Sequence, residues 1–135
     1  MKKLKKLGYI VLFASLVTLD SCLPVDDVVA DLTPALTSGT WNFKEVDEND
    51  TFVKEFYEGL YTGRSITFSS SGTFTQNLAI YNQSGNWEFN DAQTILHYDV
   101  GTSEAEDWEI LNLTNSELYY QVDFSGTVVK IRYTH

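Results

Sequence analysis

The chain has 135 residues, which is enough for one domain, and it carries 9 basic against 19 acidic residues for a formal net charge of −10. Such an acidic surface repels the phosphate backbone of nucleic acids, so we expect no nucleic-acid partner. The chain holds a single cysteine, which excludes a fold held together by internal disulfides.

The first segment, residues 1–21, has the layout of a secretory signal peptide. Four lysines near the start precede an apolar run from Leu7 to Leu19, which is too short to span a bilayer comfortably, and small residues follow around Ser21. Removal of this leader leaves five basic and eighteen acidic residues, a net charge of −13. We therefore predict an exported protein whose mature form is more acidic than the whole chain.

Cys22 follows the leader directly, in the sequence Leu19-Asp20-Ser21-Cys22. This stretch resembles the lipobox of bacterial lipoproteins, although Asp20 stands where that motif has a small or apolar residue. The resemblance implies cleavage before Cys22 and lipid on its sulfur and its new amino group. Because two or more acyl chains anchor a protein stably, we expect an outer-membrane lipoprotein of the cell envelope that meets the membrane through this lipid. An intermolecular disulfide or a free thiol is the alternative for a lone cysteine, and the periplasmic or surface face of the membrane stays open.

Residues 22–38 predict the lipidated cysteine and a tether, followed by a domain over residues 39–135. The tether has no sustained hydrophobic period, and it holds both prolines and several acidic residues. A second interpretation stays open, in which its apolar residues form a short helix or an added strand that docks on the domain: Val25, Val28, Val29, Leu32 and Leu36.

A short helix is predicted after the first strand, from Phe52 to Tyr61. The apolar residues of this segment fall on one stripe of a helix rather than alternating. Asp50 or Thr51 can cap its start, and Gly63 can end it. A strand is the second interpretation, because Gly59 weakens a helix.

The rest of the domain alternates between apolar and polar residues in short runs, which is typical of β-strands. Trp41 and Phe43 share one face of the first run, and Ile66 and Phe68 share one face of the second. Short turn sequences, such as 69–72 and 125–127, separate the runs. We count eight strands, which begin near residues 41, 65, 73, 86, 95, 108, 118 and 128. Strands of this number and spacing predict an all-β up-and-down barrel or a sandwich.

Gly39-Thr40-Trp41, at the first strand, resembles the Gly-x-Trp signature of lipocalins, and Arg132 lies on the last strand where that family has a basic residue across the tryptophan. The whole pattern is similar to the short lipocalin-like domains of exported bacterial lipoproteins, in the runs 39–41, 66–74, 85–89, 110–114 and 130–133. The resemblance implies an eight-stranded up-and-down antiparallel lipocalin-like barrel with a short helix after the first strand. It also implies a structural contact between Trp41 and Arg132, which would contribute about 0.5–2 kcal/mol.

The aromatic content, 3 Trp, 8 Tyr and 8 Phe, is the main clue to function. The residues on the faces predicted to point inward are candidates to line a ligand pocket: Phe43, Phe68, Phe74, Leu78, Trp87, Phe89, Leu118 and Tyr120. They either surround a small apolar ligand or fill the barrel themselves, because eight strands leave an interior narrow enough to be filled. The predicted helix lies where lipocalins carry a loop over the barrel mouth, so three of its residues are candidates for a lid: Phe52, Phe56 and Leu60.

Motifs for catalysis and for metal binding are missing from the sequence. It has no serine-hydrolase elbow and no phosphate loop, so we expect no enzyme and no catalytic residues. His97 and His135 have no partner at zinc spacing, and the acidic runs 47–50 and 104–107 lack the spaced ligands of a calcium loop, so we expect no metal and no cofactor.

The sequence therefore predicts a lipid-anchored envelope protein that binds a small apolar ligand. The alternative is a module with a solid core that meets a protein or a glycan through exposed tyrosines, such as Tyr57, Tyr61, Tyr81 and Tyr119.

Overall fold

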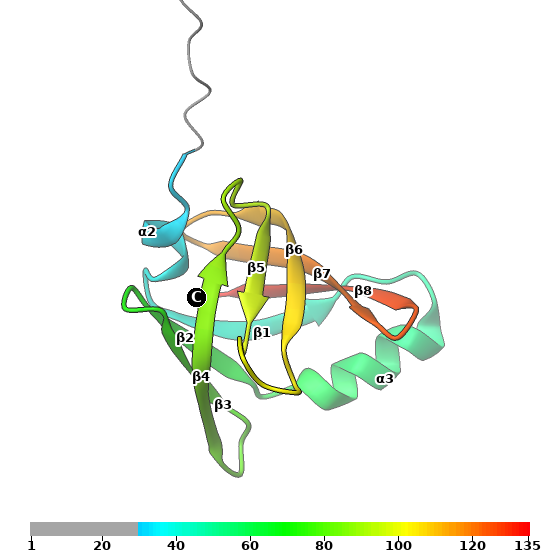
Figure 1. The fold of residues 1–135 in the computed structure, drawn as a ribbon. Helices are drawn as coiled ribbons and strands as arrows, with labels where there is room; N and C mark the ends of the chain where they lie inside the picture. Colours follow the sequence, from blue (N-terminus) through cyan, green and yellow to red (C-terminus); the bar gives the residue numbers. More distant parts are fainter. Residues whose placement is uncertain (1–29) are drawn as a thin grey trace, which may run out of the picture.

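The computed structural model describes residues 30–135, which form a closed barrel of eight antiparallel strands in chain order (Figure 1). Each strand pairs with the next, and β8 returns to pair with β1. The predicted all-β up-and-down barrel is confirmed. The predicted leader and Cys22 lie outside the described residues. The strands are β1 (Thr40–Val46), β2 (Ser65–Ser69), β3 (Thr73–Asn77), β4 (Asn82–Phe89), β5 (Ile95–Tyr98), β6 (Glu106–Leu113), β7 (Glu117–Phe124) and β8 (Thr127–Thr134).

The strands follow the alternation seen in the sequence, with every second side chain inside the barrel. β7 and β8 show this most regularly, because they bury Leu118, Tyr120 and Val122 on one strand and Val129, Ile131 and Tyr133 on the other. Ser125 and Gly126 join these two strands with φ angles of 55° and 100°. Positive φ at both central residues gives a hairpin turn whose twist matches that of the strands, and Gly126 adopts it without steric cost.

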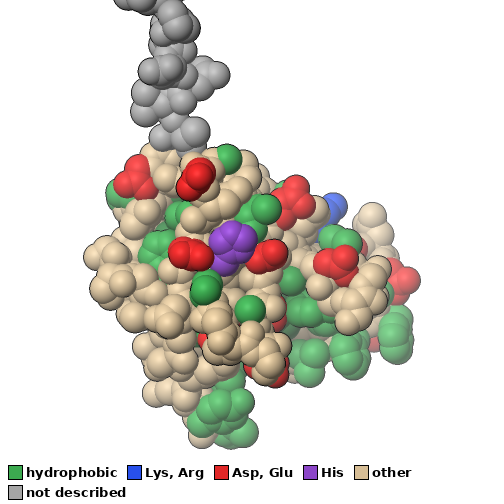
Figure 2. All heavy atoms as spheres, in the orientation of Figure 1, with side chains coloured by type: hydrophobic (Ala, Val, Ile, Leu, Met, Phe, Trp, Pro, Cys, Tyr) green, Lys and Arg blue, Asp and Glu red, His purple; other side chains and the backbone are tan. Residues whose placement is uncertain are grey.

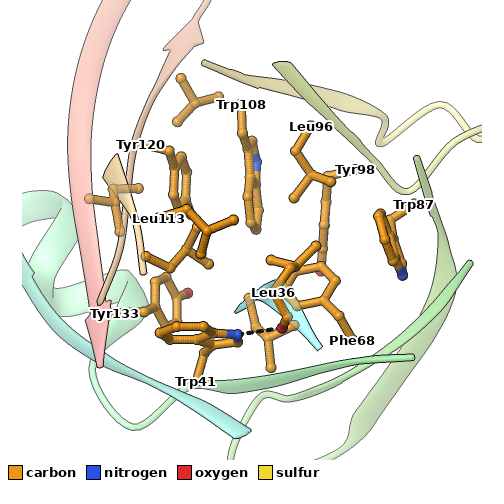
Figure 3. Close-up of a cluster of buried hydrophobic side chains, with 14 of the residues drawn as sticks. Leu36, Trp41, Phe68, Trp87, Leu96, Tyr98, Trp108, Leu113, Tyr120 and Tyr133 are labelled. Atoms are coloured by element: carbon orange, nitrogen blue, oxygen red, sulfur yellow. Dashed lines mark hydrogen bonds between the residues drawn. The ribbon is translucent and has the colours of Figure 1, made fainter. Parts of the chain in front are cut away.

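The interior of the barrel is filled by stacked aromatic rings (Figure 3). Trp108 on β6 lies between Tyr98 and Tyr120, with ring centroids 4.4 Å and 4.0 Å away and nearly parallel planes. Phe74 continues the stack on the far side of Tyr98 at 4.2 Å. We call these four residues the aromatic stack. Aromatic pairs contribute about 0.5–1.5 kcal/mol each beyond the burial of their area, so the stack is a main source of barrel stability.

A short helix, α2 (Thr33–Leu36), closes one end of the barrel, and the folded unit therefore begins before residue 39. Leu36 is fully buried, and its carbonyl accepts a hydrogen bond of 2.8 Å from Nε1 of Trp41 (Figure 3). The imidazole ring of His135 stacks on the ring of Trp41, with the two ring centroids 4.0 Å apart. The described part of the predicted tether is thus partly a docked helix, as the second interpretation of residues 22–38 allowed.

The second described helix, α3 (Thr51–Tyr61), confirms the helix predicted after the first strand. The side chain of Asp50 caps it by accepting a hydrogen bond from the backbone N–H of Val53 at 3.0 Å. Two side chains of the helix bond to Val46 at the end of β1. The ammonium group of Lys54 donates to the carbonyl of Val46, and the carboxylate of Glu58 accepts from the N–H of Val46. No helix within residues 30–135 has the length and hydrophobicity to cross a membrane.

The predicted contact between Arg132 and Trp41 is wrong. Arg132 lies on β8 between Ile131 and Tyr133, which are both fully buried, so the alternation of the strand turns Arg132 to the outer face of the barrel. Trp41 is fully buried inside. The two side chains therefore lie on opposite faces of the barrel wall.

Arg132 instead joins three strands on the outer surface. Its guanidinium lies over the ring of Tyr119 on β7, 4.2 Å from the centroid, and pairs with Glu45 on β1 at 2.6 Å and with Glu117 on β7 at 3.2 Å. Ion pairs that are partly exposed stabilise by only about 0–1 kcal/mol each. The cluster spans the β1–β8 closure of the barrel, which is a structural role, although with a different partner from the one expected.

Candidate functional site at the barrel mouth

The end of the barrel opposite α2 holds a cavity of about 190 Å³, which we call the mouth cup. It lies between the C-terminal end of α3, the β3–β4 hairpin and the loop between β5 and β6. Its aromatic walls are Tyr61, Tyr81, Tyr98 and Trp108, and its other lining residues are Arg64, Gln76, Leu78, Gln83, Asp99, Glu104 and Glu106. Because Tyr98 and Trp108 also belong to the aromatic stack, the filled interior forms the floor of the cup.

Two deeply buried polar side chains face this cavity. Gln76 on β3 is 5% exposed and Asp99, just after β5, is 4% exposed. The Tyr98 hydroxyl donates to the side-chain oxygen of Gln76 at 2.7 Å, and the side-chain amide of Gln83 donates to Asp99 at 3.4 Å. The bond to Asp99 is long and therefore weak. A buried carboxylate with so little hydrogen bonding is costly unless another group compensates its charge.

Glu106, at the start of β6, is the second partly buried carboxylate of the cup. Burial raises the pKa of its carboxyl above the ordinary value, and the nearby carboxylates of Asp99 and Glu104 raise it further. The indole N–H of Trp108, which donates to Glu106 at 2.7 Å, and the guanidinium of Arg64 oppose this rise. The carboxylate of Glu106 is therefore partly exposed to water and partly buried against the floor of the cup. Neighbouring donors and cations compensate only part of its negative charge.

Tyrosine hydroxyls gather beneath the cup. Burial, together with the neighbouring hydroxyls of Tyr61 and Tyr98, raises the pKa of both Tyr120 and Tyr133 well above the ordinary tyrosine value. Within residues 30–135 the hydroxyls of Tyr120 and Tyr133 have no hydrogen-bond partner. Buried hydroxyls are normally satisfied, so these two mark a polar region with unused hydrogen-bonding capacity next to the cup.

The cup carries more negative than positive groups. Asp99, Glu104 and Glu106 line it together with one cation, Arg64, whose guanidinium lies over the ring of Tyr61 at 4.4 Å. Among residues 30–135, no group of three His, Cys, Asp or Glu side chains has the arrangement of a metal site. The chemistry that this arrangement offers is hydrogen bonding, stacking on aromatic rings and attraction of positive charge.

The predicted pocket residues are divided between the core and the cup. Phe68, Phe74, Trp87, Leu118 and Tyr120 are buried in the core, whereas Phe43 and Phe89 are half-buried against it. Leu78 alone of the eight lines the cup. The polar lining residues were missed, although one signal was present, since Gln76 alternates with Phe74 and Leu78 and therefore shares their inward face.

The predicted lid residues do not cover the cup. Phe52, Phe56 and Leu60 are 77%, 53% and 48% exposed and form the outer stripe of α3, so that prediction is wrong. The helix packs through the neighbouring stripe, in which Tyr57 stacks on Phe124 at 5.1 Å. Tyr61, on the same stripe, is the residue of α3 that reaches the cup.

Glu106→Gln should stabilise the protein at neutral pH. Because the pKa of Glu106 is raised in the folded state, the folded protein binds this proton more tightly than the unfolded chain, and stability is lost as the pH rises through the folded pKa. Glutamine can still accept from Trp108 and carries no charge. We expect a higher urea midpoint than that of the parent protein near pH ~7 and a smaller difference near pH ~4, where Glu106 is largely protonated. A lower midpoint at neutral pH would contradict the assignment.

The sequence and the structure were compared with known protein families, curated proteins and solved structures. The sequence matches no protein-family model and no curated protein. Among solved structures, it is similar to the crystal structure of a DUF4847 family protein from Bacteroides vulgatus, with a TM-score of 0.48 and 15% identity over 74% of this chain and 94% of that chain. By its own topology the chain is a small closed β-barrel protein.

Proposed function

We propose that this protein is a lipid-anchored binding protein of the cell envelope, with a lipocalin-like barrel that takes a small polar ligand in the mouth cup. The observation that carries the proposal is the convergence of buried polar side chains on one cavity, with Gln76 and Asp99 almost fully buried beside it. Burial of polar groups costs free energy, and a cavity where they converge is the usual form of a small-molecule site.

The filled interior is the reason for proposing a polar ligand in place of the apolar ligand expected from the sequence. Trp108 and Tyr120 stack in the centre of the barrel, where an apolar ligand would otherwise lie. The cup above them offers amide, carboxylate and hydroxyl groups. A ligand that uses these groups would be small, because the cavity holds about 190 Å³.

The position of the proposed anchor suits this role. The described chain enters the barrel at α2, whereas the cup lies at the other end (Figure 1). The residues between Cys22 and Ala30 reach roughly 26 Å when fully extended. Lipid on Cys22 would therefore hold the α2 end toward the membrane and leave the cup open to the surrounding compartment.

Cys22→Ser should release the protein from the membrane. Without the thiol no lipid can be attached, and the acidic mature chain has no attraction to anionic headgroups. We expect the parent protein in the membrane fraction after a high-salt wash and the variant in the soluble fraction, as measured by immunoblotting of fractionated cells. Ser21→Ala keeps a small residue before the cysteine and should stay with the membrane. A variant without Cys22 that remains membrane-bound would contradict the anchor.

The ligand is tested by native mass spectrometry of the chain from residue 22 onward, with Cys22→Ser, purified from cells of the native host. A retained polar molecule that is lost on denaturation, and that is reduced in Gln76→Leu, supports the binding role. A clean apo mass, together with unchanged tryptophan fluorescence on addition of a polar small-molecule extract of the same cells, contradicts it.

A second function is favoured by the exposed stripe of α3. Phe52 and Phe56 stack on each other at 6.3 Å and lie open to solvent with Leu60, and Figure 2 shows apolar side chains along this helix and at the β3–β4 hairpin. Such a surface suits contact with another protein at the cell envelope. Phe56→Asp should then weaken capture of that protein without changing ligand retention or the urea midpoint.

A further inference from the structure

We propose that the ligand of the mouth cup is a small organic cation, an amine whose ammonium group lies between the carboxylates of Glu106 and Asp99 and whose carbon skeleton packs on the exposed aromatic wall at Tyr81. This inference rests on the proposed function and names the class of ligand. Three separate features of the cup lead to it.

The first feature is the balance of charge. Asp99, Glu104 and Glu106 face the cavity with Arg64 as the one cation among its lining residues, and the rest of the chain is strongly acidic. A cavity with a net negative charge in an acidic protein repels anions and concentrates cations. Anionic ligands such as phosphates and carboxylic acids are therefore disfavoured, and a cation is attracted before any contact forms.

The second feature is the unused hydrogen-bonding capacity of two carboxylates of the cup, buried Asp99 and partly buried Glu106. An ionised carboxylate can accept about four hydrogen bonds. Within residues 30–135, Glu106 accepts one from Trp108, and Asp99 accepts one long bond from Gln83. An ammonium group carries three donors and a positive charge, so it would both fill these acceptors and offset the cost of burying the charge.

The third feature is the exposed aromatic wall of the cup. Tyr81 lines the cavity and is 60% exposed, whereas both faces of Tyr98 and of Trp108 are covered within the aromatic stack. An open aromatic face attracts a cation by about 0.5–2 kcal/mol. The structure already shows this preference, because Arg64 lies over the ring of Tyr61. The aromatic wall would also cover the carbon skeleton of an organic amine, which a hydrated metal ion does not have.

A neutral polyol is the competing occupant, because its hydroxyl groups can also bond to Gln76 and its carbon skeleton can pack on Tyr81. A polyol would leave the negative charge of Asp99 and Glu106 uncompensated, whereas an amine neutralises it. The amine and the polyol differ in charge, so the experiment compares a charged ligand with a neutral ligand of similar shape.

The test is titration of the full mature chain, carrying Cys22→Ser, with 2-phenylethylamine and with its neutral counterpart 2-phenylethanol. Binding is followed by calorimetry and by tryptophan fluorescence, to which Trp108 contributes from the lining of the cup. We expect the amine to bind at least about tenfold more tightly than the alcohol, the effect of one hydrogen-bonded ion pair. Added salt should reduce this preference.

Two variants that each remove one negative charge show whether the preference for the amine depends on Glu106. Glu106→Gln should lower the affinity for the amine about tenfold or more and leave that for the alcohol unchanged. Asp107→Asn removes the same charge from the next residue of β6, which is exposed and faces His97 at 2.7 Å outside the cup. We expect this control to bind the amine as the parent protein does. Asp99→Asn provides a second test within the cup.

The outcomes distinguish the two proposals. Equal affinity for amine and alcohol, or amine binding that survives both Glu106→Gln and Asp99→Asn, overturns the inference of a cation. A neutral polar molecule retained in native mass spectrometry also overturns it, although the polar-ligand function then stands. If neither probe binds and no molecule is retained, the binding function itself fails.

Discussion

Trp108→Ala should lower the free energy of unfolding by about 3–5 kcal/mol, the usual cost of removing a large buried aromatic side chain. Trp108 is 2% exposed and stacks on Tyr98 on one side and on Tyr120 on the other. Its removal would leave a void in the centre of the barrel and strip two rings of their partners. The loss of the hydrogen bond to Glu106 adds to the cost, because that carboxylate would lose its one described donor.

The measurement is urea denaturation followed by circular dichroism, because tryptophan fluorescence changes with the substitution itself. Tyr81→Ala is the matched control. Tyr81 is an aromatic wall of the same cup but is 60% exposed, so its loss should change stability by less than about 0.5 kcal/mol. A drop of less than about 1 kcal/mol for Trp108→Ala would show that the interior is loosely packed and could still admit an apolar ligand.

The strands were predictable because the signals that specify them are local. Alternation of apolar and polar residues places each strand, and the turn at Ser125 and Gly126 is specified by the residues that form it. The cap of α3 at Asp50 is likewise contained within a few residues. The number of strands and their short connections left a barrel or a sandwich open, and the resemblance to lipocalins indicated the barrel.

The packing face of α3 could not be chosen from the sequence. Phe52, Phe56 and Leu60 form one apolar stripe at a spacing of four, and Val53, Tyr57 and Tyr61 form a second stripe one residue further on. Both stripes satisfy the helical period equally well. The barrel selects the second because Phe43 and Phe124, which come from distant parts of the chain, offer it partners. The predicted lid was therefore placed on the wrong stripe.

The mouth cup was missed for a related reason. Its residues come from α3, β3, β4, β5, β6 and the loops beside them, and each polar residue among them is unremarkable in its own segment. Asp99 illustrates this, because nothing around it in the sequence marks it as buried, whereas the close approach of β4 at Gly85 encloses it. Gln76 was the one position with a usable signal, through its inward place on β3.

The contact between Leu36 and Trp41 joins residues only five positions apart. It yields the second large prediction. Leu36→Ala should lower the free energy of unfolding by about 2–5 kcal/mol. Leu36 is fully buried against the closed end of the barrel, so its truncation leaves a cavity there. The backbone carbonyl that accepts from Trp41 stays in place, so this variant isolates the packing of the side chain.

A chain that begins at Ser38 should lose more stability than Leu36→Ala. It lacks all of α2, so the carbonyl that accepts from Nε1 of Trp41 is lost in addition to the packing of Leu36. The loss of such a hydrogen bond costs about 0.5–1.5 kcal/mol. Both variants are compared by urea denaturation with a chain that begins at Ala30, and Pro34→Ala, at an exposed position of the same helix, is the control. If the chain from Ser38 is as stable as the chain from Ala30, then α2 is only the end of a tether. If it is less stable, the anchor and the barrel are joined through a helix that is part of the core.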